Sequence, residues 1–331
     1  MTPIIPLISG TVAQPGPPLV TLDDVHAAER RIKTRVHRTP ILSSATVAAA
    51  VRCRLAFKAE LFQRTGSFKV RGVLNRLLTL PAEALRQGLV TLSAGNHGAA
   101  LAWAASAAGT RATVVMPATA VPSKVAAVRA YGGEPVLTDG NLLERCEALQ
   151  RDRGLMLIHP FDDPMIIAGH ATLGLELLED LPDIDIVVVP VGGGGLISGV
   201  AAAVKRQRAD VRVIGVEPTG ADVMCRSLAA GSPQRLDRPQ TVADGLAAPF
   251  AGALTFAHVR ALVDAVVRVE DEAIIHALRL VLERLKLAVE PAGAAALAAL
   301  LTGAASVEPG ARVVCVLSGG NMDPGVLKRL L

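Results

Sequence analysis

Aromatic side chains are nearly absent from this chain of 331 residues. It has one Trp, one Tyr and six Phe, together 2% of the sequence, whereas hydrophobic residues of all kinds make up 51%. Its cores must therefore be filled by aliphatic side chains. Proteins that bind single-stranded nucleic acids stack the bases on aromatic rings, so this class of function is disfavoured.

Closely spaced cysteines are also missing. The four cysteines lie far apart and form no Cys-x-x-Cys pair. Zinc knuckles and disulfide frameworks depend on such pairs or on regular spacings, so we expect neither of them. Reduced and mostly buried thiols are expected instead. The cysteines are Cys53, Cys146, Cys225 and Cys315.

Charge of one sign is not concentrated anywhere in the chain. The 34 basic and 30 acidic residues give a net charge of +4 and form no basic block, so a polyanion such as nucleic acid is not an expected partner. Residues 1–20 lack the basic start of a signal peptide, and no later run is long and apolar enough to span a bilayer. We expect a cytoplasmic protein without a membrane partner, preceded by a disordered extension over residues 1–20.

Short apolar runs alternate with helix-like segments from about residue 86 onward. Runs buried on both faces and separated by helical lengths are typical of a parallel sheet with helices on both sides, so the predicted fold class is α/β. Residues 276–301 indicate one or two helices interrupted at Glu290-Pro291. The predicted strands are Leu89–Leu92, Ala112–Met116, Pro135–Leu137, Leu155–Ile158, Ile184–Val191, Val211–Val216 and Arg312–Leu317.

Three segments at the ends of predicted strands carry glycines or polar residues. Ligands of open parallel sheets bind at the carboxyl ends of the strands, so these segments are the expected binding loops. They are Leu92–Gly98, Val191–Leu196 and Leu317–Asn321.

The loop Gly192–Gly195 follows the strongest predicted strand and precedes a helix. Four successive glycines suit backbone amides that curl around an anion at a helix N-terminus. A dinucleotide fingerprint needs a third glycine where the two possible frames have Ile197 or Ser198. Glu217, at the end of the next strand, keeps a nucleotide-binding module open as an alternative. A single phosphate monoester fits the loop better than a pyrophosphate.

The segment Thr65–Gly72 places Lys69 inside a turn before a helix. A lysine that holds a carbonyl compound as a Schiff base needs a fixed, partly desolvated position. A phosphate monoester and such a lysine together suggest pyridoxal 5′-phosphate. Asn96 can then hydrogen-bond the ring oxygen, Ser318 can face the pyridine nitrogen, and amides of Ser93–His97 can take a substrate carboxylate.

Seven motifs in one order resemble the fold type II family of pyridoxal-phosphate enzymes, in particular its threonine/serine dehydratase and serine racemase group. The resemblance covers residues 21–331. Its motifs are Gly66–Gly72, Ser93–Gly98, His159–Pro164, Pro190–Gly195, Val242–Ala247, Glu290–Ala294 and Leu317–Asn321.

The resemblance implies a role for each matching residue. Lys69 would be the Schiff-base and catalytic lysine, Phe68 would pack by the ring, Asn96 would meet the ring hydroxyl and Ser318 the pyridine nitrogen. The phosphate would be bound by Gly192, Gly193, Gly194, Gly195 and Leu196. The substrate would be bound by Ser93, Ala94, Gly95, Asn96 and His97.

The resemblance also implies two domains with parallel-rich open sheets. A large cofactor-binding domain would comprise residues 21–85 and 163–331, and a small mobile domain residues 86–162. Family members suggest a homodimer or homotetramer. The reaction implied is α,β-elimination from L-threonine, L-serine or a related β-hydroxy amino acid, which gives a 2-oxo acid and ammonia.

Three other functions stay open beside this dehydratase. One is a lyase for another β-hydroxy or β-substituted amino acid, and one is an amino-acid racemase. Racemases of the group carry a serine where this chain has Ala94, and a methyl group transfers no proton, so elimination is favoured. The remote alternative is a cofactor-binding protein without turnover, against which the intact Lys69, Asn96 and Ser318 argue.

Two departures from the family pattern concern the substrate and a cation. Relatives carry Gly-Gln-Gly-Thr where this chain has His170 and Ala171 within Gly169–Thr172. We expect His170 to be a packing residue, although it could shift the preferred substrate. Glu217 and the carbonyl of Ala221 match two positions of the family's cation site, but the second acid is replaced by Val223. A tight divalent site is doubtful for this reason, and a weak mono- or divalent site remains possible.

Overall fold

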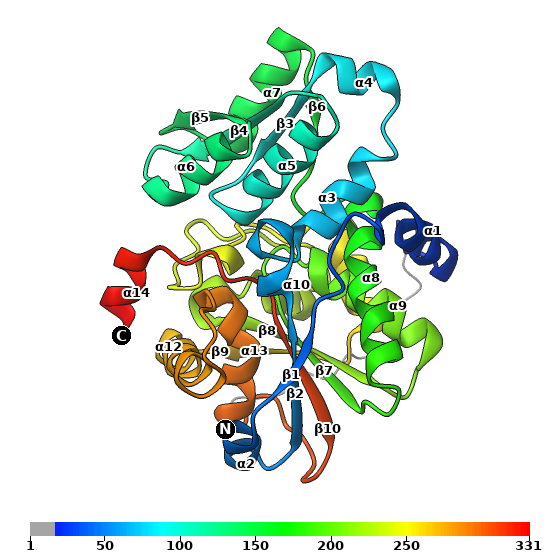
Figure 1. Ribbon diagram of the computed structural model, residues 1–331, viewed down its shortest axis with the longest axis vertical. Helices are drawn as coiled ribbons and strands as arrows, with labels where there is room; N and C mark the ends of the chain where they lie inside the picture. Colours follow the sequence, from blue (N-terminus) through cyan, green and yellow to red (C-terminus); the bar gives the residue numbers. More distant parts are fainter. Residues whose placement is uncertain (1–16) are drawn as a thin grey trace.

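The computed structural model describes residues 17–331, and its strands form two sheets that lie one above the other (Figure 1). The larger sheet has the strand order β1-β2-β10-β7-β8-β9, and all neighbours pair in parallel except β1 with β2. Its strands are β1 (Ile41–Ser43), β2 (Arg54–Ala59), β7 (Ile186–Pro190), β8 (Arg212–Pro218), β9 (Ala265–Val269) and β10 (Arg312–Leu317).

Helices cover both faces of the larger sheet, as predicted for an α/β protein. One face is covered by α2 (Ala45–Val51), α12 (Asp271–Leu280) and α13 (Pro291–Leu301). The other face packs against α8 (Pro164–Asp180), α9 (Gly195–Gln207), α10 (Val223–Ala230) and α11 (Ala253–Leu262). Both cores consist mainly of Ala, Val, Leu and Ile, in agreement with the scarcity of aromatic residues.

The smaller sheet is parallel throughout and has the order β5-β4-β3-β6. Its strands β3 (Leu89–Leu92), β4 (Ala112–Pro117), β5 (Glu134–Thr138) and β6 (Met156–Leu157) lie within the segment 86–162. On one face lie α5 (Asn96–Ala107) and α6 (Pro122–Ala130), and on the other α7 (Leu142–Arg153). The division into a large and a small mobile domain, with these boundaries, stays a prediction.

Helix α3 (Lys69–Leu77) lies between the two sheets. It packs against α5 of the smaller sheet and against α8 of the larger one. The larger sheet with the helices on its faces is called the larger half below, and the smaller sheet with its helices the smaller half. Helix α4 (Ala82–Gln87) then leads into β3. The first residue of α3 is the predicted cofactor lysine, so packing on both sides fixes its position between the sheets.

The predicted interruption of the helical stretch 276–301 is present. Helix α12 continues as a π-helical turn over Val281–Leu285, and α13 begins with Pro291 in its first turn. Pro is favoured there because its fixed φ suits a helix start and its missing N–H would have no helical partner. The two helices that remain are α1 (Leu22–Ile32) and α14 (Pro324–Leu330).

Three strands of the larger sheet escaped the sequence analysis. In strand β2, Arg54 and Lys58 stand on either side of three apolar residues, so the apolar run is too short to indicate a strand. Lys58 is nevertheless fully buried, because it is ion-paired with Glu176 at 2.7 Å. The edge strands β1 and β9 are only partly buried, so their sequences are under weaker apolar constraint.

Part of the expected N-terminal extension belongs to the fold. Residues 1–16 lie outside the described residues, but Val20 is only 3% exposed and its backbone N–H donates to Nε2 of His258 at 2.9 Å. Thr21 then caps α1 with a capping box that includes Asp24. The expected disordered extension is therefore too long at its carboxyl end.

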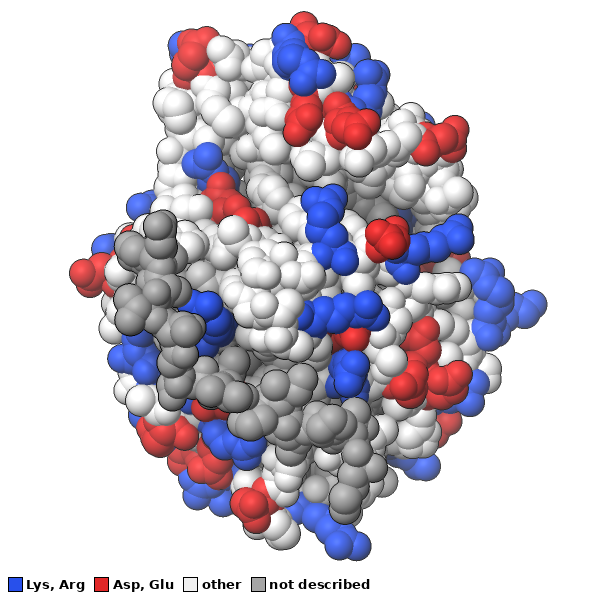
Figure 2. Space-filling model, turned by 180° about the vertical axis from the view of Figure 1, so that it is seen from behind, with Lys and Arg blue, Asp and Glu red and all other residues white. Residues whose placement is uncertain are grey.

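Acidic and basic side chains are interspersed on the face seen in Figure 2, as the distribution along the sequence predicts. In residues 17–331, no helix combines the length and apolar character that crossing a bilayer requires. None of the four cysteines is part of a disulfide, and three of them are buried.

Candidate active site

A cavity of about 260 Å³ lies between the two sheets, at the carboxyl ends of strands from both. Its lining includes every cofactor- and substrate-binding residue predicted from the sequence. The structure therefore brings together segments that lie up to 250 positions apart. Those residues are Phe68, Lys69, Ser93–His97, Gly192–Leu196 and Ser318.

Lys69 reaches the cavity from the start of α3. Its Nζ donates to the carbonyl oxygen of Pro160 at 3.1 Å and lies 5.1 Å from the centre of the Phe68 ring. Desolvation lowers the pKa of Lys69 to about 8, against a smaller raising effect of the Glu290 carboxylate. A substantial fraction of this amine is neutral near pH 8, as a nucleophile or a general base requires.

The structure of the glycine loop favours glycine at two or more of its positions. Gly194 has φ of +88°, a left-handed conformation that favours glycine. A Cβ at Gly193 would overlap the ring of Phe161, which packs directly on the loop. The loop leads into α9, whose first N–H groups have no acceptor within the helix. This cradle fits a phosphate monoester.

Asn96 is held by two side chains that face it from the larger half. Its Nδ2 donates to Oε1 of Glu290 at 2.6 Å, and its Oδ1 accepts from Nδ2 of Asn321 at 2.8 Å. These bonds leave the second hydrogen of Nδ2 for a ring oxygen. Glu290 is 3% exposed, and burial raises its pKa to about 7. No role for Glu290 was predicted from the sequence, although it belongs to the motif Glu290–Ala294.

Ser318 lies at the end of β10, close to the lysine segment. Its carbonyl oxygen accepts from the N–H of Phe68 at 3.1 Å, and its side chain is 3% exposed. Within residues 17–331, its hydroxyl makes no protein hydrogen bond. Ser318 lines the cavity, where its hydroxyl is free to donate to a pyridine nitrogen. The residues present thus fit pyridoxal phosphate.

The loop Ser93–His97 opens α5 at the cavity. Ser93 Oγ accepts from the N–H of Gly95 at 3.1 Å, so this hydroxyl is engaged within the loop. The ring of His97 is buried, and its Nε2 lies 3.4 Å from the carbonyl oxygen of Ile158. Burial and the charge of Lys69 hold the pKa of His97 well below its usual range. The backbone of the loop, more than these two side chains, is available to a ligand.

Two charged residues that the sequence analysis did not single out close one side of the cavity. Lys124, from the first turn of α6, is ion-paired with Asp244, which lies in the turn Asp244–Leu246 of the larger half. Both line the cavity. Asp244 belongs to the motif Val242–Ala247, and Lys124 belongs to none of the motifs. Their ion pair could not be predicted, because nothing in the sequence relates position 124 to position 244.

His170 does not line the cavity but lies behind Phe68. The two rings meet edge to face, with centroids 4.8 Å apart. Within the described residues neither ring nitrogen makes a hydrogen bond of regular geometry. Burial and the charge of Lys69 hold the pKa of His170 well below its usual range, against a smaller raising effect of the Gly195 backbone, so the neutral ring is favoured. Ala171 is fully buried against α9 and away from the cavity. Any effect of these two residues on substrate choice must be indirect.

The expected cation site has a different local structure. The two carboxylate oxygens of Glu217 accept the backbone N–H groups of Met224 and Cys225, each at 2.8 Å. The side chain of Val223 supplies no oxygen, and Asp222 pairs with Arg226. In the described part of the chain, no three His, Cys, Asp or Glu side chains are grouped to hold a metal. Glu217 caps α10 here, and a cation at Glu217 and Ala221 stays a prediction.

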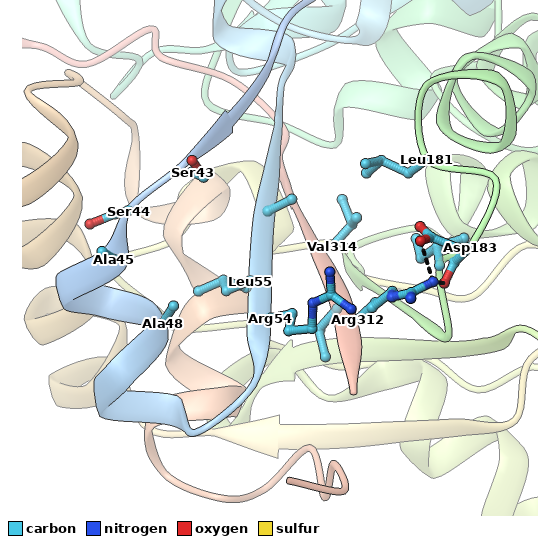
Figure 3. A pocket seen from close by; sticks show the side chains of 13 residues that line it. Ser43, Ser44, Ala45, Ala48, Arg54, Leu55, Leu181, Asp183, Arg312 and Val314 are labelled. Carbon is cyan, nitrogen blue, oxygen red and sulfur yellow. Dashed lines mark hydrogen bonds and ion pairs between the residues drawn. The ribbon is translucent and has the colours of Figure 1, made fainter. Parts of the chain in front are cut away.

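A larger cavity, of about 350 Å³, lies at the opposite ends of β2 and β10 (Figure 3). It is lined by apolar side chains, by Arg54 and by Arg312, which forms an ion pair with Asp183. It contains no lysine and no glycine loop. Because it lacks these residues, it is not the expected reactive site, although its volume exceeds that of the cavity at Lys69.

Comparisons with known proteins show the family of this chain. A family model described as pyridoxal-phosphate dependent enzyme matches residues 32–319. The chain is 45% identical to an L-threonine ammonia-lyase of Geobacter sulfurreducens over 90% of this chain and 75% of the relative. It is 39% identical to a phenylserine dehydratase of Ralstonia pickettii, over 94% and 97% of the two chains. The structure of maize serine racemase superposes with a TM-score of 0.90 at 42% identity, over 94% and 96%.

Proposed function

Because this chain belongs to the family of pyridoxal-phosphate-dependent enzymes, we propose that it is an ammonia-lyase of the dehydratase kind. It converts L-threonine, L-serine or a related β-hydroxy amino acid to a 2-oxo acid and ammonia. One observation carries the proposal: Lys69 and Ala94 line the same cavity. The pKa of Lys69 is lowered to about 8, so it can act as a base. Ala94 has only a methyl group and cannot transfer a proton.

The cofactor, when bound, supplies an electron sink that makes the Cα–H bond of an amino acid acidic. Lys69 would hold it covalently, with Phe68 beside the ring. Asn96, oriented by Glu290 and Asn321, would donate to the ring oxygen. Gly192–Leu196 would bind the phosphate, and the Ser318 hydroxyl would face the pyridine nitrogen. As a neutral group, Ser318 does not enforce a protonated pyridine as an aspartate would.

Lys69 carries the proton transfer. Once released by the incoming amino group, its neutral Nζ can take the proton from Cα, and its hydrogen bond to the Pro160 carbonyl helps to fix where Nζ lies. The hydroxyl on Cβ leaves as water once it takes up a proton, and the loss of one Cα proton to Lys69 and one hydroxyl from Cβ together balances as one molecule of water. Phe161, packed on the glycine loop, and the Lys124–Asp244 pair enclose the site on two sides.

Two neighbouring activities have specific support. The maize relative is named a serine racemase, but racemisation needs a second proton-transfer group opposite the lysine, and Ala94 has none. A lyase for a bulkier substrate is supported by the phenylserine dehydratase relative and by apolar lining residues such as Leu142 and Phe250. A non-catalytic role is disfavoured because Lys69, Asn96 and Ser318 are all present.

The deciding experiment gives the cofactor-loaded protein L-threonine, L-serine and bulkier β-hydroxy amino acids, phenylserine among them. 2-Oxo acid, ammonia and the chirality of the remaining amino acid are measured together. Equimolar acid and ammonia from threonine or serine would support the proposal. Release from phenylserine alone would reassign the substrate, and D-amino acid without release would favour the racemase.

The matched control for this experiment is Lys69→Ala. Without the amine, the visible absorbance of covalently held cofactor and the release of 2-oxo acid should both fall to background. Retained turnover in Lys69→Ala would contradict the assignment of the catalytic lysine. A homodimer or homotetramer and a cytoplasmic location remain part of the proposal, and light scattering measures the former.

A further inference from the structure

Lys124 points into the cavity next to the loop that is expected to take the substrate carboxylate. Its side chain is 14% exposed. A Cβ built on Gly95 would lie 3.1 Å from its Cδ and 3.4 Å from its Nζ. The ammonium group therefore lies next to Gly95, on the loop whose backbone N–H groups are expected to take the substrate carboxylate.

The position of Lys124 is unfavourable unless an anion faces it. It lies in the first turn of α6, and a cation near a helix N-terminus opposes the helix dipole. Two acids of the larger half compensate it. Asp244 forms the ion pair, and Lys124 is the largest of the charges that lower the pKa of buried Glu290.

Asp244 is well placed to release Lys124. Its side chain is 47% exposed, so water can solvate the carboxylate when the pair separates. Solvent at the exposed carboxylate weakens its attraction to Lys124. A carboxylate inside the cavity, which also meets the first N–H groups of α5, offers Lys124 a better-shielded partner.

A substrate carboxylate needs a positive charge that the rest of the cavity does not provide. Among the described residues that line the cavity, the cations are Lys69 and Lys124. Lys69 must be neutral to act as the base, so it cannot also balance a carboxylate. Lys124 is the cation that remains.

We propose that Lys124 binds the α-carboxylate of the substrate and exchanges its ion pair with Asp244 for one with the incoming carboxylate. The inference deepens the proposed function and rests on it for the identity of the substrate as an amino acid. It makes Lys124 a substrate-binding residue on the smaller half, and Asp244 its competitor on the larger half.

The test compares Lys124→Met with the unchanged protein on two ligands, L-threonine and L-threoninamide, in which a neutral amide replaces the carboxylate. Loss of a charge-assisted hydrogen bond should lower kcat/KM for threonine about 10- to 100-fold and leave the value for the amide within about threefold. Asp244→Asn should lower KM for threonine, because the competing anion is gone.

A binding measurement separates this inference from the proposed reaction. L-Alanine and L-alaninamide lack a leaving group, and their dissociation constants can be read from the change in visible absorbance of the bound cofactor. The preference for the carboxylate should disappear in Lys124→Met even if no β-hydroxy amino acid is turned over. The control is Arg129→Met, on the exposed side of the same helix.

Equal losses for acid and amide in Lys124→Met, with cofactor affinity unchanged, would overturn the inference. So would a preference for alanine over alaninamide that survives the substitution. Failure of the proposed function looks different, because no 2-oxo acid would then form from any substrate while the alanine preference still depended on Lys124.

Discussion

At the scale of single residues, the chemistry depends on how burial sets the charge of a few groups. Lys69 and Glu290 both line the cavity, and their opposite charges attract. Desolvation lowers the pKa of Lys69 and raises the pKa of Glu290, so it favours the neutral form of each. His170 and His97 are held neutral by burial beside Lys69. A site with few fixed charges favours a neutral amine at Lys69, which is the form that reacts with an aldehyde.

The lowered pKa of Lys69 predicts the pH dependence of cofactor uptake. Because only the neutral amine attacks the aldehyde of pyridoxal phosphate, the uptake rate of cofactor-free protein should rise with pH and level off above about pH 8. An ordinary lysine would continue to rise toward pH 10.5. Stopped-flow visible absorbance gives the profile.

Glu290→Gln provides the control for this profile. It removes a negative charge that raises the pKa of Lys69, so the midpoint should move below that of the unchanged protein. A midpoint near pH 10 in both proteins would show that Lys69 is not desolvated in solution.

At the scale of elements, two packing contacts hold the reactive segments in place. Arg71, two residues after Lys69 and fully buried, donates to both oxygens of Glu60 and both of Glu176, which fixes α3 to the turn after β2 and to α8. On the other side, Phe161 packs against the glycine loop before α9. The lysine and the phosphate cradle are thus positioned by separate parts of the core.

The contact between Phe161 and Gly193 predicts that substitutions at these two positions have non-additive effects. A Cβ in Gly193→Ala would overlap the ring, and such overpacking costs about 1–3 kcal/mol. Thermal unfolding should show a lower Tm, and cofactor titration a weaker affinity. Adding Phe161→Leu should recover part of both losses, because it removes the overlapping ring atoms.

Gly140→Ala is the matched control, since a Cβ there would meet only Thr138 Oγ1 at 3.5 Å. Strictly additive effects of Gly193→Ala and Phe161→Leu would contradict a direct contact between the two positions.

At the scale of the whole molecule, side chains of the smaller half contact the larger half across the cavity. Asn96 bonds Glu290 and Asn321, and Lys124 pairs with Asp244. Farther out, Ser123 Oγ donates to Oδ2 of Asp323 at 2.7 Å. These few polar contacts link the two sheets, which suits halves that close over a substrate and separate to release the product.

The Ser123–Asp323 hydrogen bond predicts how closure affects binding. If the smaller domain moves as predicted from the family resemblance, Ser123→Ala removes a contact of the closed form, so it should favour an open form, raise KM roughly two- to fivefold and leave cofactor affinity unchanged. The radius of gyration from small-angle scattering should increase slightly. Ser306→Ala, an exposed serine on the larger half, is the control, and an unchanged KM in Ser123→Ala would argue against closure through this contact.

The sequence was sufficient for the α/β class, for seven of the ten strands found in residues 17–331, for the helix break at Glu290-Pro291 and for the family with its cofactor. These features are encoded locally, in apolar periodicity, in glycine and proline positions and in short motifs whose residues are neighbours along the chain. Placing Gly192–Gly195 and Ser318 at strand ends was enough to predict that they meet, because parallel strands of one sheet end at one edge. Asn96 follows β3 of the smaller sheet, so its approach to them depends on how the two sheets dock.

The tertiary structure alone decided which distant side chains face one another. It placed Lys124 against Asp244, Glu290 against Asn96, and His170 behind Phe68. It also buried Lys58 in a strand that the sequence did not reveal. Such pairs depend on how two sheets dock and on which charges become desolvated together, and neither leaves a pattern in the residues around each partner.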